Sequence, residues 1–280
     1  MKAFFRRLGL GVVVVCLAYA LIYFVTYPRY TYRGTAPNMD FDRYYAMKLA
    51  ESAKLGVRPG NQEKLVRFSP GRTKLAILYI HGWSASRAEG EEVMDRVAAK
   101  LGANIYYLRL PGHGASKEEL AALVLVSPFY DFAPTSAKLF YYPGGTTLVE
   151  LLQGKVRRPT ADPTHSPAWE RFWTVEKYYS SFKSAADMVK RAARESVYRK
   201  ITDPVLMLYY YDDEKNQDTS ASVAAMKRAF DLFGKDSKPN PMNRAVAVPK
   251  AAHVMLSKWV ESDRARAEKE IVEFLAQIER

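Results

Sequence analysis

The side chain best suited to proton transfer in this chain is His253. It lies in "VPKAAHVM", directly after an apolar run that reads as a buried strand. A neutral imidazole can take up and return a proton, because the pKa of histidine is about 6.5. The other three histidines are weaker candidates, since His81 and His113 lie in glycine turns and His165 lies in a segment rich in aromatic residues.

Carboxylates that could orient such an imidazole follow another apolar run, "DPVLMLYYY". Asp213 lies close to the end of this run, and Asp218 lies slightly further on, in "NQDTSAS". Asp212 and Asp131 are lesser candidates. At most one of these acids is needed beside an imidazole, so the others are expected to be solvated loop residues.

A serine nucleophile is missing from this set. One well-known setting for such a serine on an α/β sheet is a G-x-S-x-G turn between a strand and a helix, which holds it in a strained conformation. The motif occurs nowhere in the 280 residues. The nearest approach is "GWSAS", where Ser84 or Ser86 as a substitute is a remote alternative.

The elements that must position these side chains read as an α/β sheet. The run "KLAILYIHGW" is followed by the amphipathic segment "EEVMDRVAAKLG" and then by the apolar run "NIYYLRLPGHG". Apolar strands that alternate with helices are typical of a parallel sheet covered on both faces. Three further strands are predicted in "LAALVLVSP", "DPVLMLYYY" and "RAVAVP", and two helices at about residues 40–56 and 262–278.

Residues 131–202 differ from the rest in character. They are dense in aromatic residues and prolines, as in "FYYPGGTTLVELLQG" and "WERFWTVEKYYSSF". An insertion between strands of a parallel sheet lies above the edge where ligands bind, so we predict a helical cap here. Most of its aromatic side chains are expected to form the core of the cap.

Five of these segments resemble the α/β-hydrolase superfamily, specifically its capped esterase, monoacylglycerol-lipase and serine-aminopeptidase-like branch. They are "LYIHGWSAS", "LRLPGHG", "LVLVSP", "YYYDDEKNQD" and "AAHVM", and the resemblance covers about residues 60–280. It implies a predominantly parallel sheet flanked by helices, with the cap inserted, in a domain of residues 36–280. It also implies that a serine, an acid and a histidine act in that chain order.

The resemblance assigns roles to particular residues. His253 corresponds to the general base, and Asp218 is narrowly preferred to Asp213 as the acid. His81, Gly82 and Trp83 form the oxyanion-hole loop, in which the Trp83 N–H would face the developing negative charge.

The resemblance also locates what is absent. In the related proteins a helix, the nucleophile strand and a second helix separate "PGHG" from "LVLVSP", which amounts to about 40 to 50 residues. Here eight residues, "ASKEELAA", make the connection. A parallel crossover needs about a dozen. We therefore expect either an unpaired gap in the sheet or a shifted sheet, in which the strand at Leu123 pairs with the strand that ends at His81.

Residues 8–27, "LGLGVVVVCLAYALIYFVTY", carry no charge and predict a membrane-spanning helix, so residues 1–35 read as anchor and linker. Lys2, Arg6 and Arg7 precede the segment, which favours a single-pass protein with its main domain on the extracytoplasmic side. A cleaved signal peptide is the alternative. A lipoprotein modified at Cys16, the only cysteine, is a weaker one.

Charge and motifs limit the function further. The formal net charge is +12, but acids and bases alternate without a basic stripe, so we expect no nucleic-acid partner. We expect neither a cofactor nor a metal, and the sequence leaves the oligomeric state open. The sequence predicts a carboxylic ester hydrolase by lineage that acts on apolar acyl substrates near a membrane and is impaired by the missing serine. The alternatives are a ligand-binding protein without catalysis and a deletion product of an active hydrolase.

Overall fold

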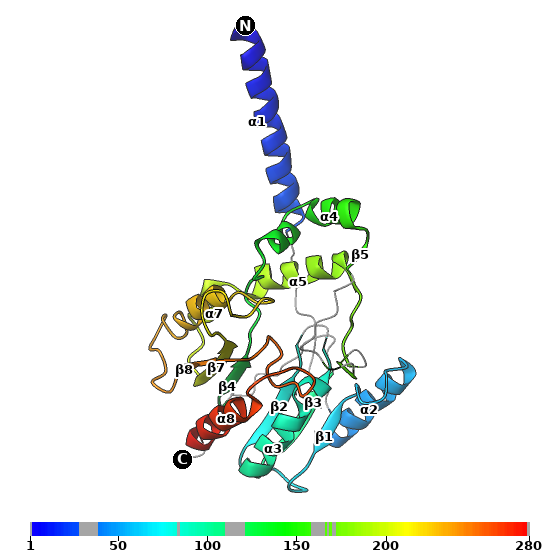
Figure 1. Ribbon diagram of the computed structural model, residues 1–280, viewed down its shortest axis with the longest axis vertical. Coiled ribbons are helices and arrows are strands. Elements are labelled where there is room, and N and C mark those ends of the chain that lie inside the picture. Colours follow the sequence, from blue (N-terminus) through cyan, green and yellow to red (C-terminus); the bar gives the residue numbers. More distant parts are fainter. Residues whose placement is uncertain are drawn as a thin grey trace.

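The structure, a computed structural model, describes residues 2–27, 39–82, 85–109, 121–157, 166, 168–169 and 172–278, with side chains from Gly9 onward (Figure 1). The helices are α1 (Lys2–Val25), α2 (Phe41–Lys54), η1 (Arg87–Glu89), α3 (Glu91–Leu101), η2 (Thr135–Tyr141), α4 (Gly145–Gln153), α5 (Tyr179–Ala192), α6 (Glu195–Tyr198), α7 (Val223–Phe230) and α8 (Arg264–Ile278). The strands are β1 (Lys64–Val66), β2 (Ala76–Ile80), β3 (Asn104–Leu108), β4 (Leu123–Val126), β5 (Val156–Arg157), β6 (Lys177–Tyr178), β7 (Val205–Tyr210) and β8 (Arg244–Val248).

Six of the strands form two three-stranded sheets with the orders β1-β3-β2 and β4-β7-β8. Within them β2 runs parallel to β3, and β7 runs parallel to both β4 and β8, while β1 is antiparallel to β3. The predicted apolar runs therefore fold as parallel strands. Strand β7 is buried over most of its length, as expected for a strand covered on both faces.

The two sheets share one hydrophobic core on the side covered by α3 and α8. Helix α3 buries Val93 and Val97 on one face, and α8 buries Ile271 and Phe274. These side chains form a single cluster that also contains residues of β3, β7 and β8. Helices α3 and α8 pack against each other and lie beside the strands in Figure 1. The two sheets are thus held together as halves of one layer.

Between the two halves the layer is interrupted. Among the described residues, β2 pairs only with β3, and β4 pairs only with β7. Ile77 and Tyr79 of β2 pack against the common core, whereas Leu78 and Ile80, on the opposite face, are 56% and 51% exposed. Of the two alternatives expected from the eight-residue connection, the shifted sheet is wrong, since β4 does not pair with β2, and an unpaired gap is what the described residues show.

Segment 131–202 contains η2, α4, α5 and α6 and has a core of its own. Phe132, Phe140 and Tyr179 are buried there, and the Phe140 ring stacks on the Phe182 ring at 5.4 Å. Five of the eleven aromatic residues of the segment belong to this core, whereas Trp169, Phe172 and Trp173 pack with Trp259, outside the segment. The expectation that most of them form the core of the cap is therefore wrong.

The predicted membrane span at residues 8–27 is not confirmed. In the part of the chain that the structure describes, no helix satisfies both the length and the hydropathy that a bilayer crossing requires. Residues 8–25 of this stretch belong to α1, which projects away from the rest of the chain (Figure 1). Helix α1 and the residues just after it contact segment 131–202. The Tyr19 hydroxyl lies 3.4 Å from the Pro143 carbonyl, and the hydroxyl of Tyr27, two residues beyond α1, lies 3.2 Å from the Lys190 carbonyl.

Candidate functional site

His253 and Asp218 are brought together by the loops that follow β8 and β7. The distance from His253 Nδ1 to Asp218 Oδ2 is 2.7 Å. Asp218 is 2% exposed, and its Oδ1 accepts hydrogen bonds from the backbone N–H groups of Ser220 and Ala221 at 2.8 and 2.9 Å. A carboxylate held in this way directs the Nδ1–H of His253 toward itself and leaves Nε2 free to accept a proton.

The environment of His253 raises its pKa. Burial acts to lower the pKa, but the hydrogen bond and the charge of Asp218 outweigh it, and the charge of Glu89 adds to them. The charge of Lys177 opposes them. The imidazolium form is therefore stabilised here, which suits a base that must hold a proton during a reaction.

The other acids considered from the sequence are engaged elsewhere. Asp213 accepts hydrogen bonds from the N–H groups of Lys215 and Asn216, and the Asn216 side chain lowers its pKa. Asp212 accepts from the N–H of Lys250. Asp131 accepts from the Tyr141 hydroxyl. The geometry thus favours Asp218 over Asp213 as the partner of His253.

The predicted oxyanion-hole loop is described only in part. His81 and Gly82 directly follow β2, whereas Trp83 lies outside the described residues. The Gly82 N–H donates to Glu89 Oε2 at 2.8 Å, and a Cβ on Gly82 would lie 3.3 Å from both oxygens of that carboxylate. Glycine therefore allows the loop to close over Glu89. Burial lowers the pKa of His81, so this imidazole is favoured in its neutral form.

Glu89 is a site residue that the sequence did not indicate. It is the last residue of η1. Burial raises its pKa, while the hydrogen bond from the Gly82 N–H and the charge of His253 act to lower it. Glu89 thus couples electrostatically to His253 and is hydrogen-bonded to the loop after β2. In the sequence it belongs to "RAEGEE", which reads only as an acidic start of a helix.

No serine in the described part of the chain is hydrogen-bonded to His253. Ser86 and Ser127 are buried, and each has an Oγ without a hydrogen-bond partner among the described residues. Ser127 also has a φ of +44°, an unusual backbone conformation for a residue with a side chain. Ser84 lies outside the described residues. The described part therefore holds a base and an acid but no serine paired to them.

The described residues show no metal site. Across the residues with described placement, no group of three or more His, Cys, Asp or Glu side chains lies close enough to hold an ion.

Comparisons with known proteins agree with the arrangement of strands and helices. No family model and no curated protein matches the sequence. Among solved structures, the chain is similar to the monoacylglycerol lipase of Paleococcus ferrophilus, with 13% identity over 77% of this chain and 98% of that chain and a TM-score of 0.54. It is also similar to a structure of metagenome-derived lipolytic enzymes, with 11% identity over 79% and 99% and a TM-score of 0.58.

A third similar structure is a soluble variant of the monoglyceride lipase of Saccharomyces cerevisiae, with 10% identity over 78% of this chain and 91% of that chain and a TM-score of 0.50. The chain has the α/β-hydrolase fold. At these identities the likeness concerns the fold alone. Within the α/β-hydrolase fold of this chain, Asp218 and His253 follow consecutive parallel strands, and the sheet is interrupted between β2 and β4.

Proposed function

We propose that the chain is an acyl hydrolase by lineage whose serine-dependent catalysis is impaired. The observation that carries this proposal is the His253–Asp218 contact of 2.7 Å beside a sheet interrupted between β2 and β4. The base and its acid are kept, and the interruption coincides with the eight-residue connection at which the resemblance expects the nucleophile strand. Because a buried acid that accepts three hydrogen bonds is unlike a solvated loop residue, the pair supports descent from an enzyme.

The chemistry left to this site is general-base activation of water. His253 Nε2 can take a proton from a water molecule, with Asp218 stabilising the imidazolium that forms. Without a serine there is no covalent acyl intermediate, so the reaction is not divided into two easier steps. We therefore propose at most slow hydrolysis of acyl esters.

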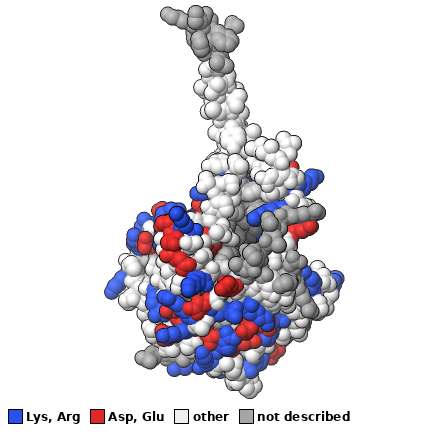
Figure 2. All heavy atoms as spheres, in the orientation of Figure 1, with Lys and Arg blue, Asp and Glu red and all other residues white. Residues whose placement is uncertain are grey.

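We also propose that the protein works at a membrane, with apolar acyl compounds as its substrates or ligands. Helix α1 exposes a continuous apolar surface, with Leu17, Leu21 and Phe24 each 64 to 65% exposed. At the base of α1, helix α4 exposes Leu151 and Leu152 to 81% and 73%. Figure 2 shows the described part of the α1 stem, from Gly9 onward, without charged side chains, whereas the body below it carries both signs. Exposed apolar surface of this extent is typical of contact with lipid or with another protein.

The side of the membrane on which the domain lies follows from the flanking charges. Lys2, Arg6 and Arg7 precede the apolar stretch, and Arg29 and Arg33 follow it. We propose the extracytoplasmic side, because the end richer in basic residues tends to stay in the cytoplasm.

A second candidate is a deletion product of an active hydrolase. The gap between β2 and β4 favours it, since Leu78 and Ile80 are exposed where a covering helix is expected on a parallel sheet. Sequencing of the native gene across residues 114–123, with the intact mass of the native protein, shows whether the natural protein itself lacks the nucleophile segment or whether this sequence is a deletion product.

Hydrolysis of short and medium-chain p-nitrophenyl esters by the full chain in detergent tests the proposed function. We expect turnover close to that of the buffer, with any excess removed by His253→Ala and unaffected by serine reagents. Lys258→Ala, an exposed residue of the same loop region, is the matched control. Rapid turnover that a fluorophosphonate abolishes would show that a working serine is present and overturn the proposal.

A further inference from the structure

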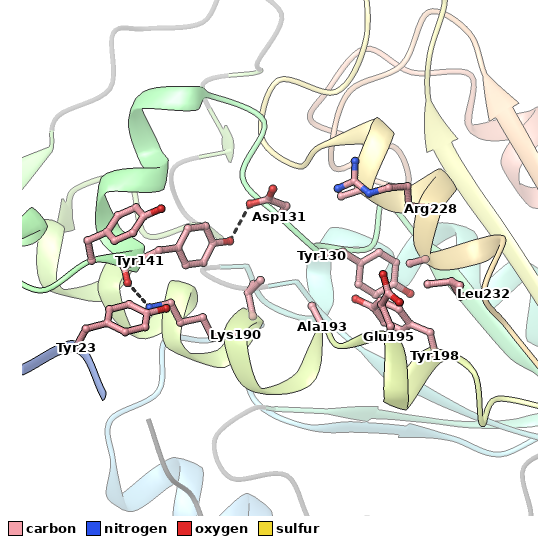
Figure 3. Close-up of a pocket in the computed structure, with 14 residues that line it drawn as sticks. Tyr23, Tyr130, Asp131, Tyr141, Lys190, Ala193, Glu195, Tyr198, Arg228 and Leu232 are labelled. Atoms are coloured by element: carbon pink, nitrogen blue, oxygen red, sulfur yellow. Dashed lines mark hydrogen bonds between the residues drawn. The ribbon is translucent and has the colours of Figure 1, made fainter. Parts of the chain in front are cut away.

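A cavity of about 430 Å³ lies beside the C-terminal end of α1, between η2, α5, α6 and α7 (Figure 3). It shares no residue with the His253–Asp218 pair. Five tyrosines line it, together with two acids and two bases. These residues are Tyr23, Tyr130, Tyr141, Tyr142, Tyr198, Asp131, Glu195, Lys190 and Arg228. Its lining therefore combines aromatic rings with balanced charge.

One end of the cavity is closed by its own contacts. Lys190 Nζ donates to the Tyr141 carbonyl and lies 4.4 Å from the centre of the Tyr23 ring. The Tyr141 hydroxyl donates to Asp131 Oδ1 at 2.9 Å. Figure 3 shows these residues together, apart from Tyr130, Tyr198 and Glu195. This end joins α1 to the helices of segment 131–202 and has little capacity left for a ligand.

The other end has polar groups without partners. Tyr198 is 7% exposed, and its hydroxyl makes no hydrogen bond with any described residue. The centroids of the Tyr198 and Tyr130 rings lie 5.1 Å apart, and the angle between the ring planes is 66°, so the two rings form a corner. Glu195 and Arg228 line the same end, are exposed, and form no ion pair within the described ranges. A buried phenol without a partner is costly, by about 1 to 3 kcal/mol, unless something binds it.

The chemistry of this end matches a ligand that carries both signs of charge. Aromatic faces beside a carboxylate bind substituted ammonium groups. A guanidinium binds phosphate through parallel N–H donors, and a phenol can add a further hydrogen bond. Tyr19 and Tyr23 lie four residues apart on α1, and Tyr27 lies four residues further on, just beyond its end. Tyrosines gather where a membrane meets water. Tyr23, the middle one of these three tyrosines, lines the cavity.

We propose that the cavity binds the head group of a zwitterionic phospholipid. The ammonium group lies in the corner of Tyr130 and Tyr198 beside Glu195, and the phosphate contacts Arg228 and the Tyr198 hydroxyl. That the ligand is a membrane lipid, and not a soluble molecule with the same head group, rests on the proposed contact of α1 with a membrane. Binding of the head group alone does not require that contact, so the two can fail separately.

The test uses the full chain in maltoside detergent and, in parallel, in nanodiscs. Calorimetric titration with glycerophosphocholine, which has the head group but no acyl chains, measures the cavity by itself. Nanodiscs of phosphatidylcholine compared with phosphatidylglycerol measure head-group preference at a bilayer. The variants are Tyr198→Phe, Arg228→Gln and Glu195→Gln. The controls are Arg266→Gln and Glu261→Gln, two exposed residues at or near α8.

We expect saturable binding of glycerophosphocholine that weakens about 2- to 10-fold in Tyr198→Phe and by about 10-fold or more in Arg228→Gln. Both controls should bind as the parent chain does. Absence of saturable binding, or equal losses in the Arg266→Gln control, overturns the proposal. Binding of both kinds of nanodisc without binding of glycerophosphocholine also overturns it and leaves the α1 contact standing. Binding of glycerophosphocholine without binding of any nanodisc supports the cavity and refutes the membrane contact.

Discussion

Replacing Asp218 by asparagine should lower the pKa of His253. The carboxylate lies 2.7 Å from His253 Nδ1 and is almost fully buried, so its charge is poorly screened. A hydrogen bond to a charged group contributes about 1.5 to 3 kcal/mol, so the imidazolium form of His253 should lose stabilisation of that order. Asparagine keeps an oxygen for the Ser220 and Ala221 N–H groups, so the loop should stay folded.

The assay is an NMR titration of imidazole signals, with the His253 signal assigned from the spectrum of His253→Gln. Asp213→Asn is the control, because that carboxylate bonds to its own turn and should leave the titration unchanged. An unchanged pKa in Asp218→Asn, or an equal shift in Asp213→Asn, would refute the assignment of the pair.

The same change predicts how stability depends on pH. The folded pKa of His253 is raised, so the stabilisation from its protonated form is fully present below the unfolded value of about 6.5 and is lost as the pH rises through the folded pKa. Urea unfolding should therefore show Asp218→Asn to be most destabilising at about pH 5 to 6 and less so at pH 9. A destabilisation that grows with pH contradicts this reasoning.

Three further predictions concern the gap and the apolar surface. Hydrogen exchange should be faster in β2 and β4 than in β3 and β7, because β2 and β4 each pair along one edge only among the described residues; equal protection would mean that the gap is filled in solution. Leu78→Ala should cost less than about 1 kcal/mol of unfolding free energy, whereas Leu206→Ala, fully buried, should cost about 2 to 5 kcal/mol; similar losses would show that Leu78 is covered. Leu151→Glu with Leu152→Glu should reduce flotation with lipid vesicles; unchanged flotation would exclude α4 from the lipid contact.

Strands β2, β3, β4, β7 and β8 were predictable because each is a short apolar run bounded by glycine, proline or polar residues, whereas the two-residue strands β5 and β6 lie in the segment predicted as a helical cap and were not expected. The residues of β2, β3, β4, β7 and β8 all lie inside the predicted runs. An interruption of the sheet was one of two expected outcomes, since an eight-residue connection is too short for a parallel crossover of the usual size. The sequence could not decide whether the strand at Leu123 would stay apart from the strand that ends at His81 or pair with it.

The details of the site were less predictable. Asp213 and Asp218 follow the same strand, and only the turn that Asp213 forms with Asn216 shows which carboxylate is left for His253. Glu89 was missed because an acid before a helix has an ordinary explanation. Its approach to the loop depends on η1 and on the absence of a side chain at Gly82. The apolar stretch at residues 8–27 predicted a helix correctly, but its role as a membrane span is unconfirmed.

The central claim is that a folded α/β-hydrolase scaffold here keeps its base and acid without a working nucleophile. The most direct test treats the folded full chain with an excess of a fluorophosphonate and measures its intact mass, with an active serine esterase as the positive control. The account predicts no adduct on this chain under conditions that label the control completely. A stoichiometric adduct on one serine, lost in His253→Ala, would contradict it.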